Sequence, residues 1–157
     1  MENDLLFKFE TPTHRDITQL IRNIRPKDRD EVLASHGTVS QAIKSALRQS
    51  EYAFTLRARG RLLGICGLVP VSVMGSIGMP WWLSTKSVDR YPITFYRASK
   101  IFIDSAHEQY DTLQNFVDTR YTQALNWLRR IGFEVEHNTV EELRGVRFVL
   151  VRSQKRV

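Results

Sequence analysis

The sequence contains a single cysteine, Cys66, with no histidine or second cysteine nearby. A disulfide needs two cysteines and a structural zinc site needs four clustered ligands, so the sequence excludes both. No histidine lies at metal-ligand spacing from an acidic residue, and no metal is expected. The first ten residues carry acidic side chains and no apolar run of signal-peptide length. We therefore expect a cytoplasmic protein in a reducing compartment.

Uninterrupted apolar stretches are also lacking. Residues 62–85 are uncharged and long enough to cross a bilayer, but four glycines and two prolines interrupt them. This pattern favours buried strands joined by turns, so no membrane partner is expected. Positive charge is in small excess, at +6, and half of it lies in the basic tail at 152–157. The remaining cations are too scattered for a nucleic-acid surface, which leaves weak binding through the tail as the last-ranked alternative.

The length and composition, 157 residues with 42% hydrophobic and 25% charged, predict one α/β domain over residues 1–157. Thr13 and Asp16 predict the start of a helix that ends before Pro26, a second helix runs from Pro26 to Ala34, and Thr38 begins a third. Strands follow at 52–56, 62–71 and 80–85, then a helix at 92–110, a strand at 113–117, a helix at 121–131, and strands at 133–136 and 146–151 joined by a polar loop. This order predicts a central twisted mixed sheet with helices on both faces.

One segment and the element order resemble a known superfamily. Residues 124–133, A-L-N-W-L-R-R-I-G-F, are similar to the fourth-helix signature of the GNAT (N-acetyltransferase) superfamily, in which an Ala precedes an aliphatic-Gly-Phe ending. Between Trp81 and Val151, the segments W-W-L-S-T, Y-D-T-L-Q-N-F-V-D and L-R-R-I-G-F-E-V resemble the small GNAT-like internal-virion protein of short-tailed phages of the T-odd type. That resemblance implies a phage-encoded protein in the host cytoplasm or packaged in the virion.

The GNAT resemblance implies that acetyl-CoA lies in a V-shaped gap between two parting parallel strands, here 81–85 and 113–117. Its pyrophosphate would lie at the start of the helix that begins at Pro92, where unpaired N–H groups and the helix dipole favour an anion. Catalysis in this fold orients an amine against the thioester and polarises its carbonyl, so CoA and an amine acceptor are the expected partners. The implied cofactor-binding residues are Leu83, Ser84, Thr85, Lys86, Arg90, Thr94 and Arg97.

The phosphate loop departs from the family's pattern. That loop normally contains glycines, whereas residues 86–95, K-S-V-D-R-Y-P-I-T-F, contain none. The cations Lys86, Arg90 and Arg97 either approach the phosphates in place of a backbone cradle or form a solvated helix face.

The catalytic positions also depart from it. The Tyr that many family members carry four residues before the helix-ending Gly is Leu128 here. Glu51 stays as a candidate base and Tyr121 as a candidate catalytic group. Each has a plain alternative, an exposed carboxylate at the start of a strand for Glu51 and an aromatic ring packed on the sheet for Tyr121.

Two hypotheses follow. The first is an acetyl-CoA-dependent N-acetyltransferase with degenerate cofactor and catalytic motifs. The second is a non-catalytic GNAT-like phage protein that serves in virion assembly or genome ejection and contacts a phage or host protein. Both require the strands near Leu83 and Asn115 to be parallel neighbours that part to leave a wedge.

Overall fold

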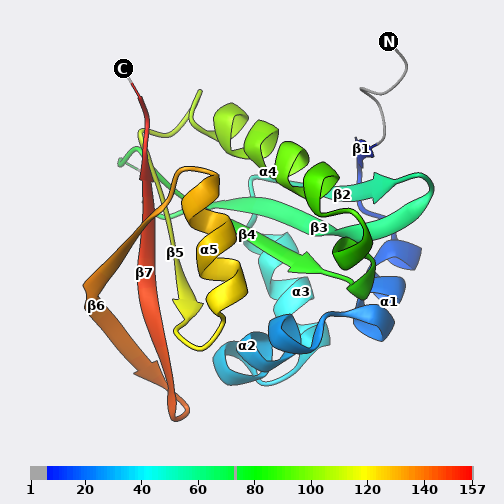
Figure 1. Ribbon diagram of the computed structural model, residues 1–157, viewed down its shortest axis with the longest axis horizontal. Helices are drawn as coiled ribbons and strands as arrows, with labels where there is room; N and C mark the ends of the chain where they lie inside the picture. Colours follow the sequence, from blue (N-terminus) through cyan, green and yellow to red (C-terminus); the bar gives the residue numbers. More distant parts are fainter. Residues whose placement is uncertain (1–6, 73, 157) are drawn as a thin grey trace.

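The computed structural model describes residues 7–72 and 74–156 and contains a seven-stranded mixed sheet (Figure 1). The strand order is β1-β2-β3-β4-β5-β7-β6, and all neighbours are antiparallel except β4 and β5, which are parallel. The strands are β1 (Phe7–Glu10), β2 (Tyr52–Ala58), β3 (Arg61–Pro70), β4 (Ile77–Ser84), β5 (Thr112–Asp118), β6 (Glu134–Leu143) and β7 (Val146–Gln154).

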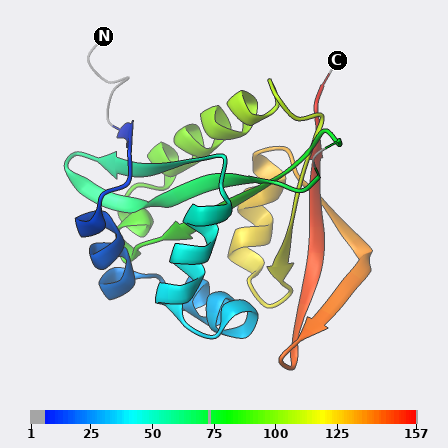
Figure 2. The ribbon, with the colours of Figure 1, turned by 180° about the vertical axis from the view of Figure 1, so that it is seen from behind.

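Helices cover both faces of this sheet, as predicted. Views from opposite sides show α4 and α5 over one face and α1 and α3 over the other (Figures 1 and 2). In both views α2 lies beyond the carboxyl ends of β4 and β5. The helices are α1 (His14–Asn23), α2 (Pro26–His36), α3 (Val39–Gln49), α4 (Pro92–Ala106) and α5 (Thr122–Arg130), with a 3-10 helix, η2 (Lys86–Arg90), between β4 and α4. The predicted mixed α/β fold is confirmed.

Local signals fix the first three helices. The Thr13 hydroxyl accepts a hydrogen bond from the Asp16 N–H at 3.1 Å, and the Asp16 carboxylate accepts one from the Thr13 N–H at 2.9 Å, which forms the predicted capping box. Pro26 occupies the first turn of α2, where no N–H is needed. The Thr38 hydroxyl caps α3 by accepting from the Gln41 N–H at 3.1 Å.

The core has a layer on each face of the sheet. Leu20 of α1 and Ile43 of α3 pack with Ile65 and Trp81 on one face. On the other face, Cys66 is buried in a cluster of apolar side chains from α4, α5, β5 and β7. Burial raises the pKa of the Cys66 thiol. Because Trp81 and Trp82 are adjacent in β4, they point to opposite faces, as the alternation of a strand requires.

Several sequence-based boundaries were wrong: α4 ends at Ala106 and not at residue 110, β4 begins at Ile77 and not at residue 80, and three larger differences concern the edges of the sheet. The short edge strand β1 was not predicted, although F-K-F-E alternates in the way a strand requires. The polar loop expected after residue 136 is the continuation of β6 to Leu143, with a bulge after Glu136 and a turn at Arg144 and Gly145, both at positive φ. This edge strand is exposed almost throughout, so it has no apolar period to reveal it. Finally, β7 continues to Gln154, which places Arg152 of the predicted tail inside a strand.

Candidate active site

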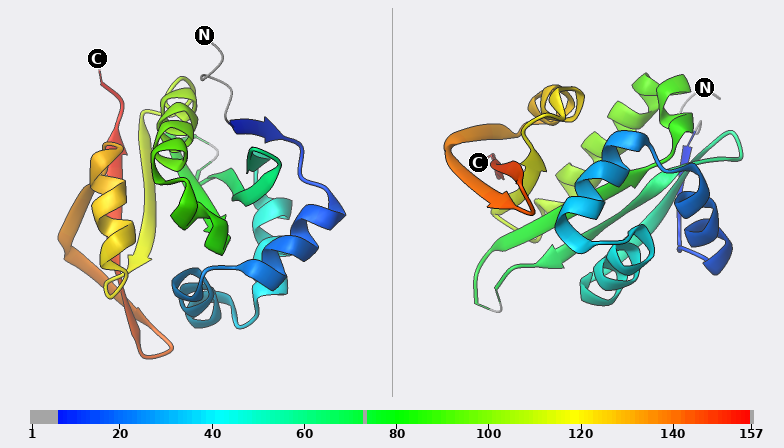
Figure 3. Two further views of the ribbon diagram at one scale, coloured as in Figure 1. Left: turned by 45° about the vertical axis from the view of Figure 1, so that its right-hand side comes forward. Right: turned by 90° about the horizontal axis from the view of Figure 1, so that it is seen from below.

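The parallel strands β4 and β5 pair at their amino ends only. Their register contains two residue pairs, Ile77 with Thr112 and Gly78 with Leu113, and beyond these the strands part. Both strands keep their other neighbours along most of their length, since β4 pairs with β3 and β5 pairs with β7. A wedge therefore opens inside the sheet toward the carboxyl ends of β4 and β5, as the resemblance implied; Figure 3 shows the two strands diverging.

A side chain ties the narrow end of this wedge. The Asn115 amide donates a hydrogen bond from Nδ2 to the Pro80 carbonyl at 2.8 Å, across the gap. The same amide accepts from the Phe116 N–H through Oδ1 at 2.7 Å, which fixes its orientation. The side chain thus replaces the ladder bonds that parallel strands would otherwise make there.

Backbone groups of β4 face the open part of the wedge. In the antiparallel ladder with β3, the Thr85 N–H donates to Leu63 and the Val71 N–H donates to the Ile77 carbonyl, so the odd-numbered residues of β4 bond to β3. Alternation then turns the even-numbered residues toward β5. Trp82 lies beyond the last β4–β5 pair, so its N–H and C=O face the wedge without a strand partner.

The helix α2 closes the wide end of the wedge. Its start is held at the end of β4 by a bridge between Ile24 and Thr85 and by the Arg25 N–H, which donates to the Ser84 carbonyl at 2.9 Å. One turn later, Asp28 accepts from the Ser84 N–H at 2.7 Å. Three residues on, Glu31 accepts from the Asp118 N–H of β5 at 3.4 Å. Asp28 and Glu31 of α2 therefore each bind the free edge of a different strand.

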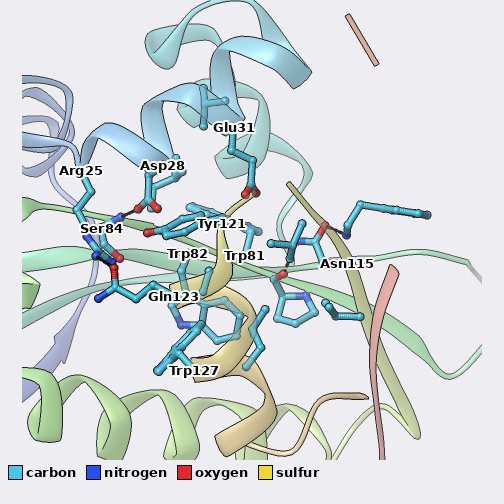
Figure 4. A pocket seen from close by; sticks show the side chains of 18 of the residues that line it. Arg25, Asp28, Glu31, Trp81, Trp82, Ser84, Asn115, Tyr121, Gln123 and Trp127 are labelled. Atoms are coloured by element: carbon cyan, nitrogen blue, oxygen red, sulfur yellow. Dashed lines mark hydrogen bonds between the residues drawn. The ribbon is translucent and has the colours of Figure 1, made fainter. Parts of the chain in front are cut away.

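A cavity of about 1020 Å³ occupies the wedge and continues between α4 and α5 (Figure 4). Trp81 and Trp82 contribute to its wall, and Trp127 of α5 lies below Trp82 in an edge-to-face contact with ring centroids 5.0 Å apart. Phe95 of α4 stacks on Trp127 at 5.0 Å. The Trp127 Nε1–H is buried without a hydrogen-bond partner among the described residues. The cavity is thus apolar along the sheet and polar where α2 meets it.

Two carboxylates of α2 in this cavity, Asp28 and Glu31, have raised pKa values. Burial raises the pKa of Asp28 to about 6, although bonds from Ser84 and Tyr121 and the charge of Arg25 oppose the shift. Burial, and then the negative charge of Asp28, raise the pKa of Glu31 to about 8. Burial and Asp28 also raise the pKa of Tyr121, whose hydroxyl therefore stays protonated beside Asp28. Raised carboxylate pKa values in a cavity are typical of catalytic sites.

Arg25 crosses the wide end of the wedge above Tyr121. Its guanidinium donates to the Gln123 side chain at 2.7 Å and pairs with Asp89 of η2 at 3.1 Å. The same group lies 5.8 Å from the centroid of the Tyr121 ring, at cation–π distance. Arg25 thus links the start of α2 to both η2 and α5.

Some of the predicted cofactor-binding residues line the cavity and others do not. Leu83 and Ser84 line the cavity. Thr85 is buried, and its hydroxyl donates to the Leu62 carbonyl at 2.6 Å. The other four do not line the cavity: Thr94 is half-buried, and the cations Lys86, Arg90 and Arg97 are exposed. The cations that do line it are Arg25 and Arg130.

The two predicted catalytic candidates are also separated. Tyr121 lines the cavity beside Asp28. Glu51 does not line it, and its carboxylate accepts a hydrogen bond from the Tyr110 hydroxyl at 2.5 Å at the start of β2. Of the two, only Tyr121 is placed to meet a ligand in the wedge.

Sequence reasoning missed Asp28, Glu31, Asn115 and Trp127. A weak signal was present for the two acids, because positions 28, 31, 32 and 35 share one face of α2 and include the buried Val32. An acidic residue on an apolar helix face indicates a site. No local signal marks Asn115 or Trp127, because their roles depend on the parting of β4 from β5.

The cavity fits the extended, amide-bearing arm of acetyl-CoA better than it fits the phosphates. The unpaired backbone of Trp82 and the orphaned Trp127 Nε1–H offer partners to such an arm. At the phosphate end, Tyr91 gives α4 no side-chain cap, so the first turn keeps free N–H groups for an anion. The glycine-free connection, however, folds into η2, whose turns use the N–H groups of Val88 and Tyr91.

The described part of the chain shows neither a metal-ligand cluster nor a helix able to span a membrane. No group of three or more His, Cys, Asp or Glu residues there could hold a metal ion. Among the described helices, none has both the length and the apolar character that crossing a membrane requires.

The sequence matches no protein-family model and no curated protein sequence. Solved structures match over nearly the whole length of both chains. A variant of spermidine N-acetyltransferase SpeG from Vibrio cholerae has a TM-score of 0.72 at 10% identity, covering 96% of this chain and 94% of that one. AAC(6')-Ib in complex with ribostamycin and coenzyme A gives 0.72 at 11% identity, with 95% and 93% covered. An acetyltransferase of the GNAT family from Bacillus anthracis gives 0.68 at 8% identity, with 96% and 95% covered. The likeness is therefore one of fold, and the fold is that of the GNAT N-acetyltransferases.

Proposed function

We propose that this chain is an acetyl-CoA-dependent N-acetyltransferase that acts on an amine. The observation that carries the proposal is the parting of β4 from β5 beside a cavity of about 1020 Å³. A gap inside a sheet leaves backbone groups unpaired, which is costly unless a ligand or water satisfies them. The similarity to GNAT-fold acetyltransferases, one of them in complex with coenzyme A, supports the same conclusion.

The donor would lie along the edge of β4. The Trp82 N–H and C=O would bind the arm as a neighbouring strand does, and the Trp127 Nε1–H would donate to an acceptor on it. The first turn of α4 and Arg130 are placed to meet the phosphates. Leu83 and Ser84 stay as proposed contacts in the wedge, and Thr85, Lys86, Arg90, Thr94 and Arg97 as proposed contacts around it. Acetyl-CoA, when bound, supplies an acetyl group on a thioester.

The acceptor would approach from the α2 side. That side of the cavity carries the carboxyl groups of Asp28 and Glu31 and the protonated Tyr121 hydroxyl, so it presents polar groups to an amine. Electrostatic contacts between an amine and these groups would be stronger in the cavity than in water, because the dielectric constant there is lower. Tyr121 holds Asp28 in place through its hydroxyl and is the candidate proton donor nearest the wedge.

Calorimetric titration with acetyl-CoA tests the donor site, and thiol release with a panel of primary amines tests turnover. We expect binding in the micromolar to low millimolar range and release of one thiol per amide formed. Absence of heat at millimolar acetyl-CoA, together with an unchanged melting temperature, would overturn the proposal.

A second candidate function rests on η2. A connection that uses its own N–H groups in a 3-10 helix offers fewer of them to a pyrophosphate, which favours a non-catalytic role. Together with the resemblance of residues 81–151 to the internal-virion protein, this suggests a phage protein that binds a phage or host protein. Such a protein would lie in the host cytoplasm or be packaged in the virion. Detection in purified virions, with no acetyl-CoA binding, is the expected result for this role. Turnover by a protein that is missing from virions rejects it.

A further inference from the structure

Glu31 has no cation beside it among the described residues. Its Oε2 accepts one long hydrogen bond, from the Asp118 N–H at 3.4 Å, and its side chain lines the cavity. The charged groups acting on it are Asp28 on its own helix and Asp118 on β5, both acidic. Each of those has a cation of its own, since Asp118 pairs with Arg120 at 2.8 Å and Asp28 is near Arg25.

A second observation indicates that a ligand belongs in this cavity. The Trp127 indole N–H, buried in the same cavity wall, also lacks a partner among the described residues. An unmade hydrogen bond to a buried donor costs stability unless a ligand or water supplies it. No group of metal ligands surrounds Glu31 in the described residues.

Asp28 is not free to bind a cation. Its carboxylate accepts from the Ser84 N–H at 2.7 Å, which holds the helix α2 against β4, and it faces the Tyr121 hydroxyl. Glu31, one turn away, projects toward the cavity (Figure 4).

We propose that Glu31 binds the acceptor as a primary ammonium ion and removes its proton, with Asp28 as a positioning residue. The inference rests on the proposed function. In this step an N–H bond of the ammonium ion breaks and an O–H bond forms on the Glu31 carboxylate. The electron pair of the broken bond stays on nitrogen, which becomes the nucleophile.

The pH dependence follows from the groups around Glu31. Asp28 on α2, Asp118 with Arg120 on β5 and Tyr121 at the start of α5 face it, and Glu141 of β6 and His36 of α2 line the same cavity. Because the empty site holds Glu31 protonated below a pKa of about 8, an ammonium ion that binds there at pH 7 displaces that proton into solvent. Binding should therefore strengthen as the pH rises from 7 to 8.

The test uses the full chain without cofactor, with n-butylamine as the probe and n-butanol as its neutral isostere. Calorimetry in two buffers of different ionisation enthalpy measures affinity and protons released. The wild-type chain is expected to prefer the amine and to release up to one proton per amine bound at pH 7. Glu31→Gln should bind the amine roughly tenfold more weakly or worse, without proton release. The glutamine carbonyl can still accept from the Asp118 N–H, so the fold should persist, and a melting curve checks this.

Glu142→Gln is the matched control, because it removes an exposed carboxylate of β6 that does not line the cavity. It should keep the wild-type affinity and proton release. Equal affinity of the wild-type chain for amine and alcohol, no amine binding, or an undiminished affinity in Glu31→Gln overturns the inference.

Acetyl-CoA binding separates this inference from the proposed function. Wild-type binding of n-butylamine with no binding of acetyl-CoA would leave Glu31 as an amine site and reject the acetyltransferase. Acetyl-CoA binding and turnover with an unchanged acid limb of kcat/KM in Glu31→Gln would reject Glu31 and keep the acetyltransferase.

Discussion

Two indole N–H groups in the site differ in their partners. The Trp81 Nε1–H donates to the Ser50 hydroxyl at 2.8 Å, whereas the Trp127 Nε1–H is buried without a partner among the described residues. A satisfied buried donor stabilises the fold, and an orphaned one destabilises it until a ligand arrives. The two tryptophans therefore provide a matched pair of tests.

Trp127→Phe keeps the stacking on Phe95 and removes the orphaned donor. We expect stability to be unchanged or raised by up to about 1 kcal/mol, and acetyl-CoA to bind several-fold more weakly. Trp81→Phe should instead lower stability by about 1 kcal/mol, because it breaks the bond to Ser50. Urea unfolding and calorimetry measure both. A Trp127→Phe chain that loses stability as Trp81→Phe does would contradict the assignment.

Glu31 should make the folded chain less stable at high pH. Its pKa is about 8 in the folded chain against an ordinary value of 4.5, so the folded state keeps a proton that the unfolded chain has released. The free energy of unfolding therefore falls as the pH rises from about 5 to 8. Glu31→Gln should be more stable than the wild type at pH 8, by on the order of 2 kcal/mol, and similar at pH 5. Parallel urea profiles of the two chains across this range would show that the raised pKa is absent.

Asp16 acts in the opposite direction at acidic pH. Burial alone would raise its pKa, but hydrogen bonds from Thr13 and Thr55 and the charge of Arg57 hold the pKa below its usual value. The stability that Asp16 contributes is present above pH 4 and is lost as the pH falls through its folded-state pKa. Asp16→Asn should cost about 2 kcal/mol at pH 7 and flatten the acid limb of the stability curve, measured by urea unfolding. Lys100 and Asp104, an exposed i,i+4 pair, provide the control, and Asp104→Asn should cost less than about 0.5 kcal/mol.

At the scale of elements, β4 is bonded on one edge along its length and on the other edge only at its start. Trp81 and Leu83 donate toward β3, and Trp82 between them faces the wedge. Amide hydrogen exchange should therefore alternate along this strand, with the Trp82 N–H exchanging at least roughly tenfold faster than its two neighbours. Added acetyl-CoA should slow the Trp82 exchange selectively. Uniform protection of all three amides in the free chain would mean that the wedge is closed in solution.

The elements differ in how far the sequence could predict them. The helices α1 and α3 each begin with a Thr, Thr13 or Thr38, whose side chain accepts from the N–H three residues later. This local signal made both helix starts predictable. Edge strands β1 and β6 bury little, so their patterns were weak or absent. In the site, Leu83, Ser84 and Tyr121 could be placed through the resemblance. Asp28 and Glu31 could not, because what they bind is set by where α2 docks, and no local pattern specifies docking.

At the scale of the whole molecule, the sheet consists of two parts, β1–β4 and β5–β7, that share two residue pairs. Side chains add further links across the wedge, among them Asn115 at its narrow end and Asp28 and Glu31 of α2 at its wide end. Asn115→Asp would set a carboxylate against the Pro80 carbonyl and should cost about 2 kcal/mol. Thermal unfolding checks the loss, and acetyl-CoA bound between the two parts should restore part of it. An undiminished melting temperature would show that the parts do not depend on this link.

The buried cysteine on β3 permits a thiol assay of turnover and can report on opening of the fold. Cys66 is shielded by α4, and its thiol resists ionisation while the chain is folded. A thiol-specific dye should therefore react very slowly with the native protein, so an assay of the proposed turnover by CoA release would have little background. With no substrate present, the slow rate at which the dye labels Cys66 would measure how often α4 separates from the sheet.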